Sequence, residues 1–107
     1  MSISFSEYIN EDENNRVEFL FDNFDFFDGN DLTVKILNEK CGVEIGEKID
    51  GIWYTIIPLH YNGDEFKLVW HEDVGNYIYS ESKEDESIKK MRKLVQIAVD
   101  ELTQIIK

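Results

Sequence analysis

The sequence has one cysteine, one proline and no long hydrophobic run, and these shortages exclude several classes of protein. Because Cys41 is alone, the chain cannot form an intramolecular disulfide or a cysteine-based zinc site. The longest apolar stretch is far shorter than the roughly 20 residues that a membrane-spanning helix requires. The first residues, MSISFSE, contain neither the basic nor the apolar region of a secretory signal. We therefore expect a cytoplasmic protein that does not enter a membrane.

Basic residues are also scarce, because 11 lysines and arginines stand against 23 aspartates and glutamates, giving a formal net charge of -12. This charge repels phosphate groups, so we expect no direct binding of nucleic acid or of anionic lipid. It favours fast association with cationic partners. The 107 residues, of which 42% are hydrophobic, are enough for a single folded domain over residues 1–107.

The clearest local pattern is a hairpin in the middle of the chain. Two strand-like runs, 52–61 and 64–71, flank Asn62-Gly63, and Asn-Gly is typical of a two-residue type I′ turn. Such a turn places Tyr61 opposite Asp64 and fixes the register of the remaining pairs. One face of the hairpin is mixed and is predicted to be half-exposed or covered from outside the sheet. The other face is predicted to be core: Trp53, Thr55, Ile57, Leu59, Phe66, Leu68 and Trp70.

Three further strands are predicted around this hairpin. Residues 16–22 alternate between apolar and other side chains, as a half-buried strand does. Residues 77–79 form a third antiparallel strand after an acidic turn, and residues 43–48 are a further candidate. Pro58 cannot donate a hydrogen bond to a neighbouring strand, so its strand is predicted to lie at an edge or to be bulged there.

Two helices are predicted on either side of these strands. Asp31 as N-cap and Gly42 as C-cap indicate a short helix over residues 32–41. From Ile88 onwards, apolar residues recur at steps of three and four, which predicts an amphipathic helix of about five turns. The predicted fold is a two-layer α+β domain in which an antiparallel sheet of about four to five strands carries both helices.

Signatures of catalysis are missing. His60 and His71 share a face of the predicted hairpin but lie on the order of 20 Å apart, too far to bind one metal ion. Cys41 falls in the last turn of its helix, where the helix dipole raises the pKa of a thiol, and no base is signalled nearby. No phosphate-binding glycine loop or serine-nucleophile motif occurs. We therefore expect no enzyme activity, no metal ion and no cofactor.

The remaining distinctive feature is the mixture of acidic and aromatic residues. Aromatic side chains surrounded by carboxylates suit an interface with a basic protein. Phe24, Phe26 and Phe27 lie among aspartates, and the sequence favours core and partner contact equally for them. The candidate partner-binding residues are Asp25, Asp28, Asp31, Glu72, Asp73, Tyr77 and Tyr79.

Residues 66–79, FKLVWHEDVGNYIY, carry a resemblance to a known group of proteins. A strand ends in Trp70, an acidic turn with Gly75 follows, and a short apolar strand leads to the C-terminal helix. From Gly42 onwards this arrangement resembles small immunity proteins of bacterial polymorphic-toxin and contact-dependent inhibition systems. The resemblance implies a cytosolic inhibitor that binds and neutralises one toxin domain, often a basic nuclease.

Three functions are compatible with these observations. The first is an immunity or antitoxin-type inhibitor that covers a cationic active site with its acidic surface. The second is a structural or regulatory module that forms a homodimer through the mixed sheet face or the last helix. The third is an acidic mimic of DNA, in which carboxylates occupy the positions of phosphates.

Overall fold

The computed structural model describes residues 3–24 and 29–106, which form an antiparallel sheet and two α-helices. The α+β class is therefore confirmed. The sheet has seven strands, more than the four to five expected, in the order β1-β2-β7-β6-β5-β3, and β4 also pairs with β5. In chain order, the elements are β1 (Ser4–Asn10), the 3-10 helix η1 (Glu11–Glu13), β2 (Arg16–Asp22), α1 (Gly29–Cys41), β3 (Glu44–Ile45), β4 (Ile49–Asp50), β5 (Tyr54–Tyr61), β6 (Asp64–His71), β7 (Gly75–Ser80) and α2 (Asp85–Ile106).

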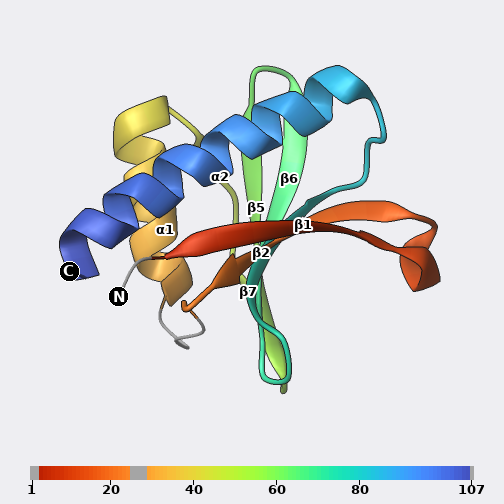
Figure 1. Cartoon of the computed structure of the whole chain (residues 1–107), viewed down its shortest axis with the longest axis horizontal. Coiled ribbons are helices and arrows are strands. Elements are labelled where there is room, and N and C mark those ends of the chain that lie inside the picture. Colours follow the sequence, from red (N-terminus) through yellow and green to blue (C-terminus); the bar gives the residue numbers. More distant parts are fainter. Residues whose placement is uncertain (1–2, 25–28, 107) are drawn as a thin grey trace.

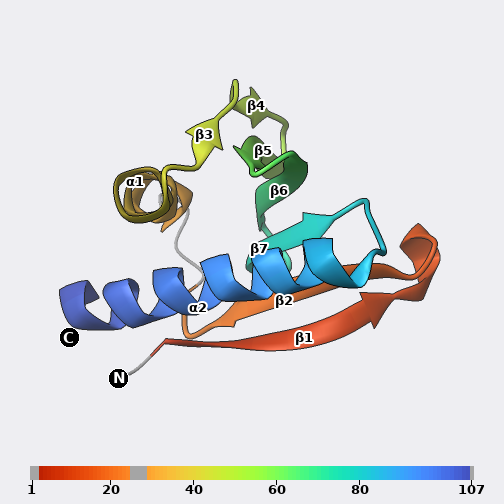
Figure 2. The ribbon, with the colours of Figure 1, turned by 90° about the horizontal axis from the view of Figure 1, so that it is seen from above.

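Both helices lie on the same side of the sheet, and α2 runs along the length of the molecule (Figures 1 and 2). The helix α2 contacts β1, β2, β7 and α1, while α1 contacts β6 and β3. We call the helix-covered side the inner face and the opposite side the outer face. The periodicity of the last helix is confirmed, because these members of its apolar stripe are buried: Ile88, Met91, Leu94, Val95, Ala98, Val99 and Leu102.

The β5–β6 hairpin has the predicted register. Asn62 and Gly63 have φ angles of 49° and 84°, the positive values that a type I′ turn requires. Tyr61 pairs with Asp64, and Thr55 pairs with Trp70 at the far end. Of the side chains assigned to the core on this hairpin, all but the two tryptophans are buried.

Pro58 lies where the neighbouring edge is interrupted. Along the edge of β5 that faces away from β6, β3 pairs with His60 and Leu59, and β4 pairs with Ile56 and Thr55. The Pro58 carbonyl accepts a hydrogen bond from the Gly46 amide at 2.8 Å, so this backbone position faces the gap between the two short strands. Of the strand expected over 43–48, only Glu44–Ile45 forms, as β3, and β4 follows beyond that range. The missing Pro58 donor faces the break between these two short strands.

The start of α1 differs from the prediction. The helix begins at Gly29, so Asp31 lies within its first turn and is not the N-cap. A Cβ atom at Gly29 would lie 2.8 Å from Cζ of Phe24 and 2.9 Å from Nδ2 of Asn76, so the close packing of this turn requires glycine. Phe24 is buried and belongs to the core, whereas Phe26 and Phe27 lie outside the described residues. The predicted C-cap is confirmed, since Gly42 has a φ of 71°.

Candidate functional site

The loop between β4 and β5 places two large apolar residues at one end of the sheet. The Gly51 amide donates to the Tyr54 carbonyl at 2.8 Å, so Ile52 and Trp53 form a two-residue hairpin loop. A Cβ atom at Gly51 would lie 2.5 Å from the Tyr54 ring. The ring therefore packs directly on the glycine backbone, and the conformation of the loop depends on a residue without a side chain.

The next turn, between β6 and β7, is joined to this loop. Its backbone is closed by a hydrogen bond from the Val74 amide to the His71 carbonyl at 3.1 Å. The Glu72 amide then donates to the Trp53 carbonyl at 2.9 Å, which holds the two turns together. We call the surface formed by these turns the two-turn tip, and its residues are Ile52, Trp53, Glu72, Asp73 and Val74.

The two-turn tip is apolar and exposed. Ile52 is 85% exposed, Trp53 59% and Val74 44%. Nine large hydrophobic side chains are exposed among the described residues, and five of them lie at the tip or beside it: Ile49, Ile52, Trp53, Tyr54 and Val74. Scattered exposed apolar residues are ordinary in proteins, whereas a cluster of this kind indicates an interaction surface.

The prediction that Trp53 belongs to the core is therefore wrong. The strand predicted over 52–61 starts two residues too early, because β5 begins at Tyr54 and both Ile52 and Trp53 belong to the loop. The dipeptide Asp50-Gly51 could have revealed this, since it is a turn signal directly before the strand. Trp70, the other tryptophan assigned to the core, is partly buried.

Negative charge adjoins the apolar part of the tip. Glu72 and Asp73 are both exposed, and within residues 3–24 and 29–106 neither carboxylate has a cationic side chain at ion-pairing distance. They line a shallow depression of about 260 Å³ together with Trp53 and His71. The Asp73 amide donates to Nδ1 of His71 at 3.1 Å, so the imidazole is held against the turn. An aromatic ring and two uncompensated carboxylates thus share one hollow.

The hollow continues onto the outer face of the sheet. A groove of about 220 Å³ crosses β5, β6 and β7, and His71 lines both depressions. The groove is mainly apolar and aromatic, and its lining residues are Arg16, Tyr54, Ile56, Val69, His71, Tyr77 and Tyr79. The mixed hairpin face predicted from the sequence is therefore a partly exposed outer face without a helix over it.

A buried ion pair closes one end of this groove. Glu18 is 1% exposed and accepts hydrogen bonds from Nη2 of Arg16 at 2.6 Å, from Nε of Arg16 at 2.9 Å and from Nδ2 of Asn10 at 3.0 Å. The guanidinium also lies 3.6 Å above the centroid of the Tyr79 ring. Burial, together with a hydrogen bond and the negative charge of Glu18, raises the pKa of Tyr8. The positive charge of Arg16 is thus neutralised within the fold.

The residues predicted to bind a partner fall in different places. Glu72 and Asp73 belong to the two-turn tip, Tyr77 lines the outer groove, and Tyr79 is only 8% exposed beneath Arg16. Asp31 lies on α1, on the opposite side of the sheet from the two tyrosines, 3.5 Å from Nζ of Lys48. Asp25 and Asp28 lie outside the described residues. The structure therefore joins part of the predicted set to Trp53, and the role of these residues in binding stays a prediction.

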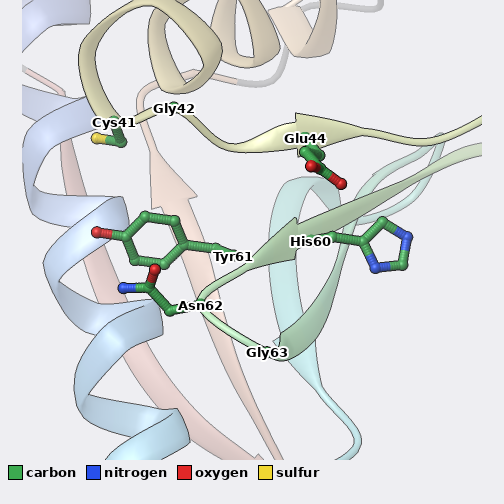
Figure 3. Close-up of a pocket in the computed structure, with 7 residues that line it drawn as sticks. All are labelled: Cys41, Gly42, Glu44, His60, Tyr61, Asn62 and Gly63. Atoms are coloured by element: carbon green, nitrogen blue, oxygen red, sulfur yellow. The ribbon is translucent and has the colours of Figure 1, made fainter.

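A third depression lies between the end of α1 and the β5–β6 turn (Figure 3). It measures about 290 Å³, and Cys41 and His60 are among its lining residues. Burial raises the pKa of the Cys41 thiol. The imidazole of His60 does not point at the thiol, and its Nε2 lies 3.5 Å from Oε1 of Glu65. These two side chains do not form a thiol–imidazole pair.

In the described part of the chain, no three histidine, cysteine, aspartate or glutamate side chains come together as metal ligands. No helix there has both the length and the apolar character to cross a membrane. No protein-family model, curated protein sequence or solved structure matches this chain.

Proposed function

We propose that this chain is a non-catalytic binding protein that attaches to a basic surface of another protein, in the manner of an immunity or antitoxin-type inhibitor. The observation that carries the proposal is the two-turn tip, where Trp53 is 59% exposed beside two uncompensated carboxylates. Tryptophan is enriched among the residues that dominate binding energy, and it supplies a large rigid contact area. Glu72 and Asp73 give the same contact a preference for lysine and arginine.

The distribution of positive charge supports this choice of partner. Two of the four cations of α2 are engaged by carboxylates of other elements: Nζ of Lys90 lies 2.7 Å from Asp64, and Nη2 of Arg92 lies 2.8 Å from Glu7. The net charge of -12 is therefore not offset by a strongly basic patch on this helix. A cationic partner is attracted from a distance, and the aromatic contact then retains it.

The basicity of the partner is tested by capture from a lysate of the native host. The tagged protein is immobilised, and bound proteins are eluted by increasing salt and identified. The matched comparison uses a Glu72→Gln/Asp73→Asn variant and a Glu39→Gln/Glu47→Gln variant, each of which removes two exposed charges. We expect one basic protein that is released by salt, is lost with the first variant and is retained with the second. Equal retention by both variants, or a partner without basic character, contradicts the proposal.

A homodimer formed through the outer face is the second candidate. The groove across β5, β6 and β7 is apolar, and Tyr54 at its border is 38% exposed. Two copies could cover this face with each other, although each brings the same negative charge. Sedimentation of the purified protein tests this candidate: association in the micromolar range that a Tyr54→Ser/Ile56→Ser variant abolishes supports it, and a monomer throughout that range contradicts it.

A further inference from the structure

The two edges of the sheet are protected to different degrees. At one edge, β3 and β4 are only two residues each, and the break between these two strands lies opposite Pro58 of β5. At the other edge, β1 has seven residues and pairs with β2 along its whole length. Among the described residues, no strand pairs with β1 on its other side (Figure 2). A row of backbone donors and acceptors is therefore available along β1.

The sequence of β1 has little of the usual protection of an edge strand. Such strands normally carry a lysine, a proline, a bulge or an inward-pointing charge that prevents pairing with another chain. The segment SFSEYIN contains no lysine, arginine or proline, and its register with β2 is unbroken. Its single charge, Glu7, lies on the inner face opposite Phe19 and is neutralised there by an ion pair with Arg92. This compensated charge is the only such device in the strand.

Side chains of β1 offer contacts to such a strand. Ile9 is 50% exposed and Tyr8 is 37% exposed, and they point to opposite faces of the sheet. On the same face as Ile9, Phe5 packs edge-on against Phe19 with ring centroids 5.6 Å apart. A strand beside β1 would continue this inner apolar layer past Phe5 and Ile9.

Exposed carboxylates flank this edge, and the cations beside it are already paired. Arg92 of α2 is paired with Glu7, and Arg16 is paired with Glu18. The carboxylates of η1, residues 11–13, are exposed at one end of β1, and Asp22 accepts hydrogen bonds from Ser4 and Ser6 towards the other end.

We propose that the free edge of β1 accepts an extended, basic segment of a partner protein as an eighth strand of the sheet. Backbone hydrogen bonds provide the affinity, apolar side chains of the segment contact Phe5 and Ile9, and its lysines or arginines face the flanking carboxylates. The basic character of the occupant rests on the proposed function. A second copy of this chain fits less well, because it brings two acidic surfaces together.

The probe for this edge is a synthetic peptide of alternating lysine and valine, matched in length to β1. The control peptide has the same side chains with its backbone amides N-methylated, which removes the hydrogen-bond donors and keeps the charge. Binding is followed by amide hydrogen exchange of the full protein. We expect the first peptide to slow exchange in β1 and the methylated peptide to have little effect. Equal binding of both peptides, or protection confined to other elements, contradicts the proposal.

Two variants distinguish binding of the peptide at the β1 edge from its general attraction to the negative charge of the protein. Ile9→Lys places a protective lysine on β1, and Ile105→Lys makes the same change at an isoleucine of α2 with similar exposure, 55% against 50%. We expect the first variant to weaken peptide binding by about tenfold and the second by less than about twofold. Equal weakening contradicts the proposal, as does self-association without peptide that Ile9→Lys abolishes.

This experiment is independent of the two-turn tip. If the tip variant loses the natural partner while the peptide gives no protection of β1, the result would support the proposed function and contradict only the proposal that β1 accepts a strand. If the peptide instead protects β1 while the natural partner is not basic, the result would contradict the proposed function and support the proposal that β1 accepts a strand.

Discussion

The amide of Glu72 donates a 2.9 Å hydrogen bond to the carbonyl of Trp53, and this bond joins two turns that are 19 positions apart in the sequence. It uses backbone atoms only, so both side chains are free to contact another molecule. The same bond fixes the backbone that carries the exposed indole relative to the backbone that carries Glu72 and Asp73. A preorganised aromatic contact loses less conformational entropy on binding than a mobile one.

Replacing Trp53 should therefore have little effect on folding. We expect Trp53→Ser to change the free energy of unfolding by less than about 1 kcal/mol, because the side chain is mostly exposed and the backbone bond does not depend on it. Urea denaturation measures this quantity. A loss of several kcal/mol would show that the indole supports the fold. The exposure of Trp53 would then no longer support the tip as a binding site.

The Arg16–Glu18 pair should behave in the opposite way. Arg16→Leu leaves the carboxylate of Glu18 buried without its guanidinium, so we expect a loss of about 3 to 5 kcal/mol in the free energy of unfolding. The double variant Arg16→Leu/Glu18→Leu removes both charges and should recover most of that loss. If the double variant is as unstable as the single one, packing around Arg16, including its contact with Tyr79, is the dominant contribution.

The ion pair between α2 and the β5–β6 turn predicts a pH dependence. A hydrogen bond from Lys90 lowers the pKa of Asp64, a second one from Ser87 lowers it further, and the charge of Lys90 adds to the effect. Because the folded pKa lies below the unfolded value, the contribution to stability is complete above the unfolded pKa and is lost as the pH falls through the folded pKa. We expect Lys90→Ala to raise the pKa of Asp64 towards its ordinary value, as measured by NMR titration of the carboxyl carbon.

The same variant has a matched control. Lys89 lies next to Lys90 on α2, and its ion pair is with Glu86 of the same helix at 3.7 Å. Lys89→Ala should leave the pKa of Asp64 close to its value in the unchanged protein. A similar shift in both variants would mean that the overall charge of the helix, and not the contact with Lys90, sets this pKa. The difference in stability between Lys90→Ala and the unchanged protein should shrink below the folded pKa.

The charge at the tip should act mainly on the rate of association. We expect the Glu72→Gln/Asp73→Asn variant to bind the captured partner with a slower association rate and a weaker dependence on salt. Stopped-flow measurements at several salt concentrations test this, with Glu39→Gln/Glu47→Gln as the variant that removes equal charge elsewhere. If the association rate falls equally in both variants, net charge accounts for the effect and the position of Glu72 and Asp73 does not.

Local chemistry in the sequence determined how much of the fold could be predicted. The β5–β6 register follows from Asn62-Gly63, because only a few residue pairs adopt the two positive φ angles of this turn. The strand β1 could not be predicted in the same way, since most of its side chains are exposed and it shows no clear alternation. The start of α1 depends on the packing of Gly29 against Phe24 and Asn76. Phe24 lies before the helix and Asn76 is distant in the sequence, so the local pattern does not indicate this start.

The candidate site was only partly predictable for a similar reason. The sequence indicates an acidic turn at Glu72 and Asp73. Alternation along the strand, however, predicts a core position for Trp53, the residue that gives this turn its apolar neighbour. The contact between the two turns is made by backbone atoms, and these leave no pattern in the sequence. The separation of Asp31 from Tyr77 follows from the placement of α1 on the inner face, which periodicity alone does not determine.

If Trp53 anchors a partner protein, the captured partner must bind the Trp53→Ser variant more weakly than the unchanged protein. The control is Ile105→Ser, which shortens another exposed apolar side chain. Isothermal titration calorimetry should show a loss of about 2 kcal/mol or more for Trp53→Ser, or roughly 30-fold in the dissociation constant, and almost none for Ile105→Ser. An unchanged affinity for Trp53→Ser, in a protein that remains folded, would contradict the account.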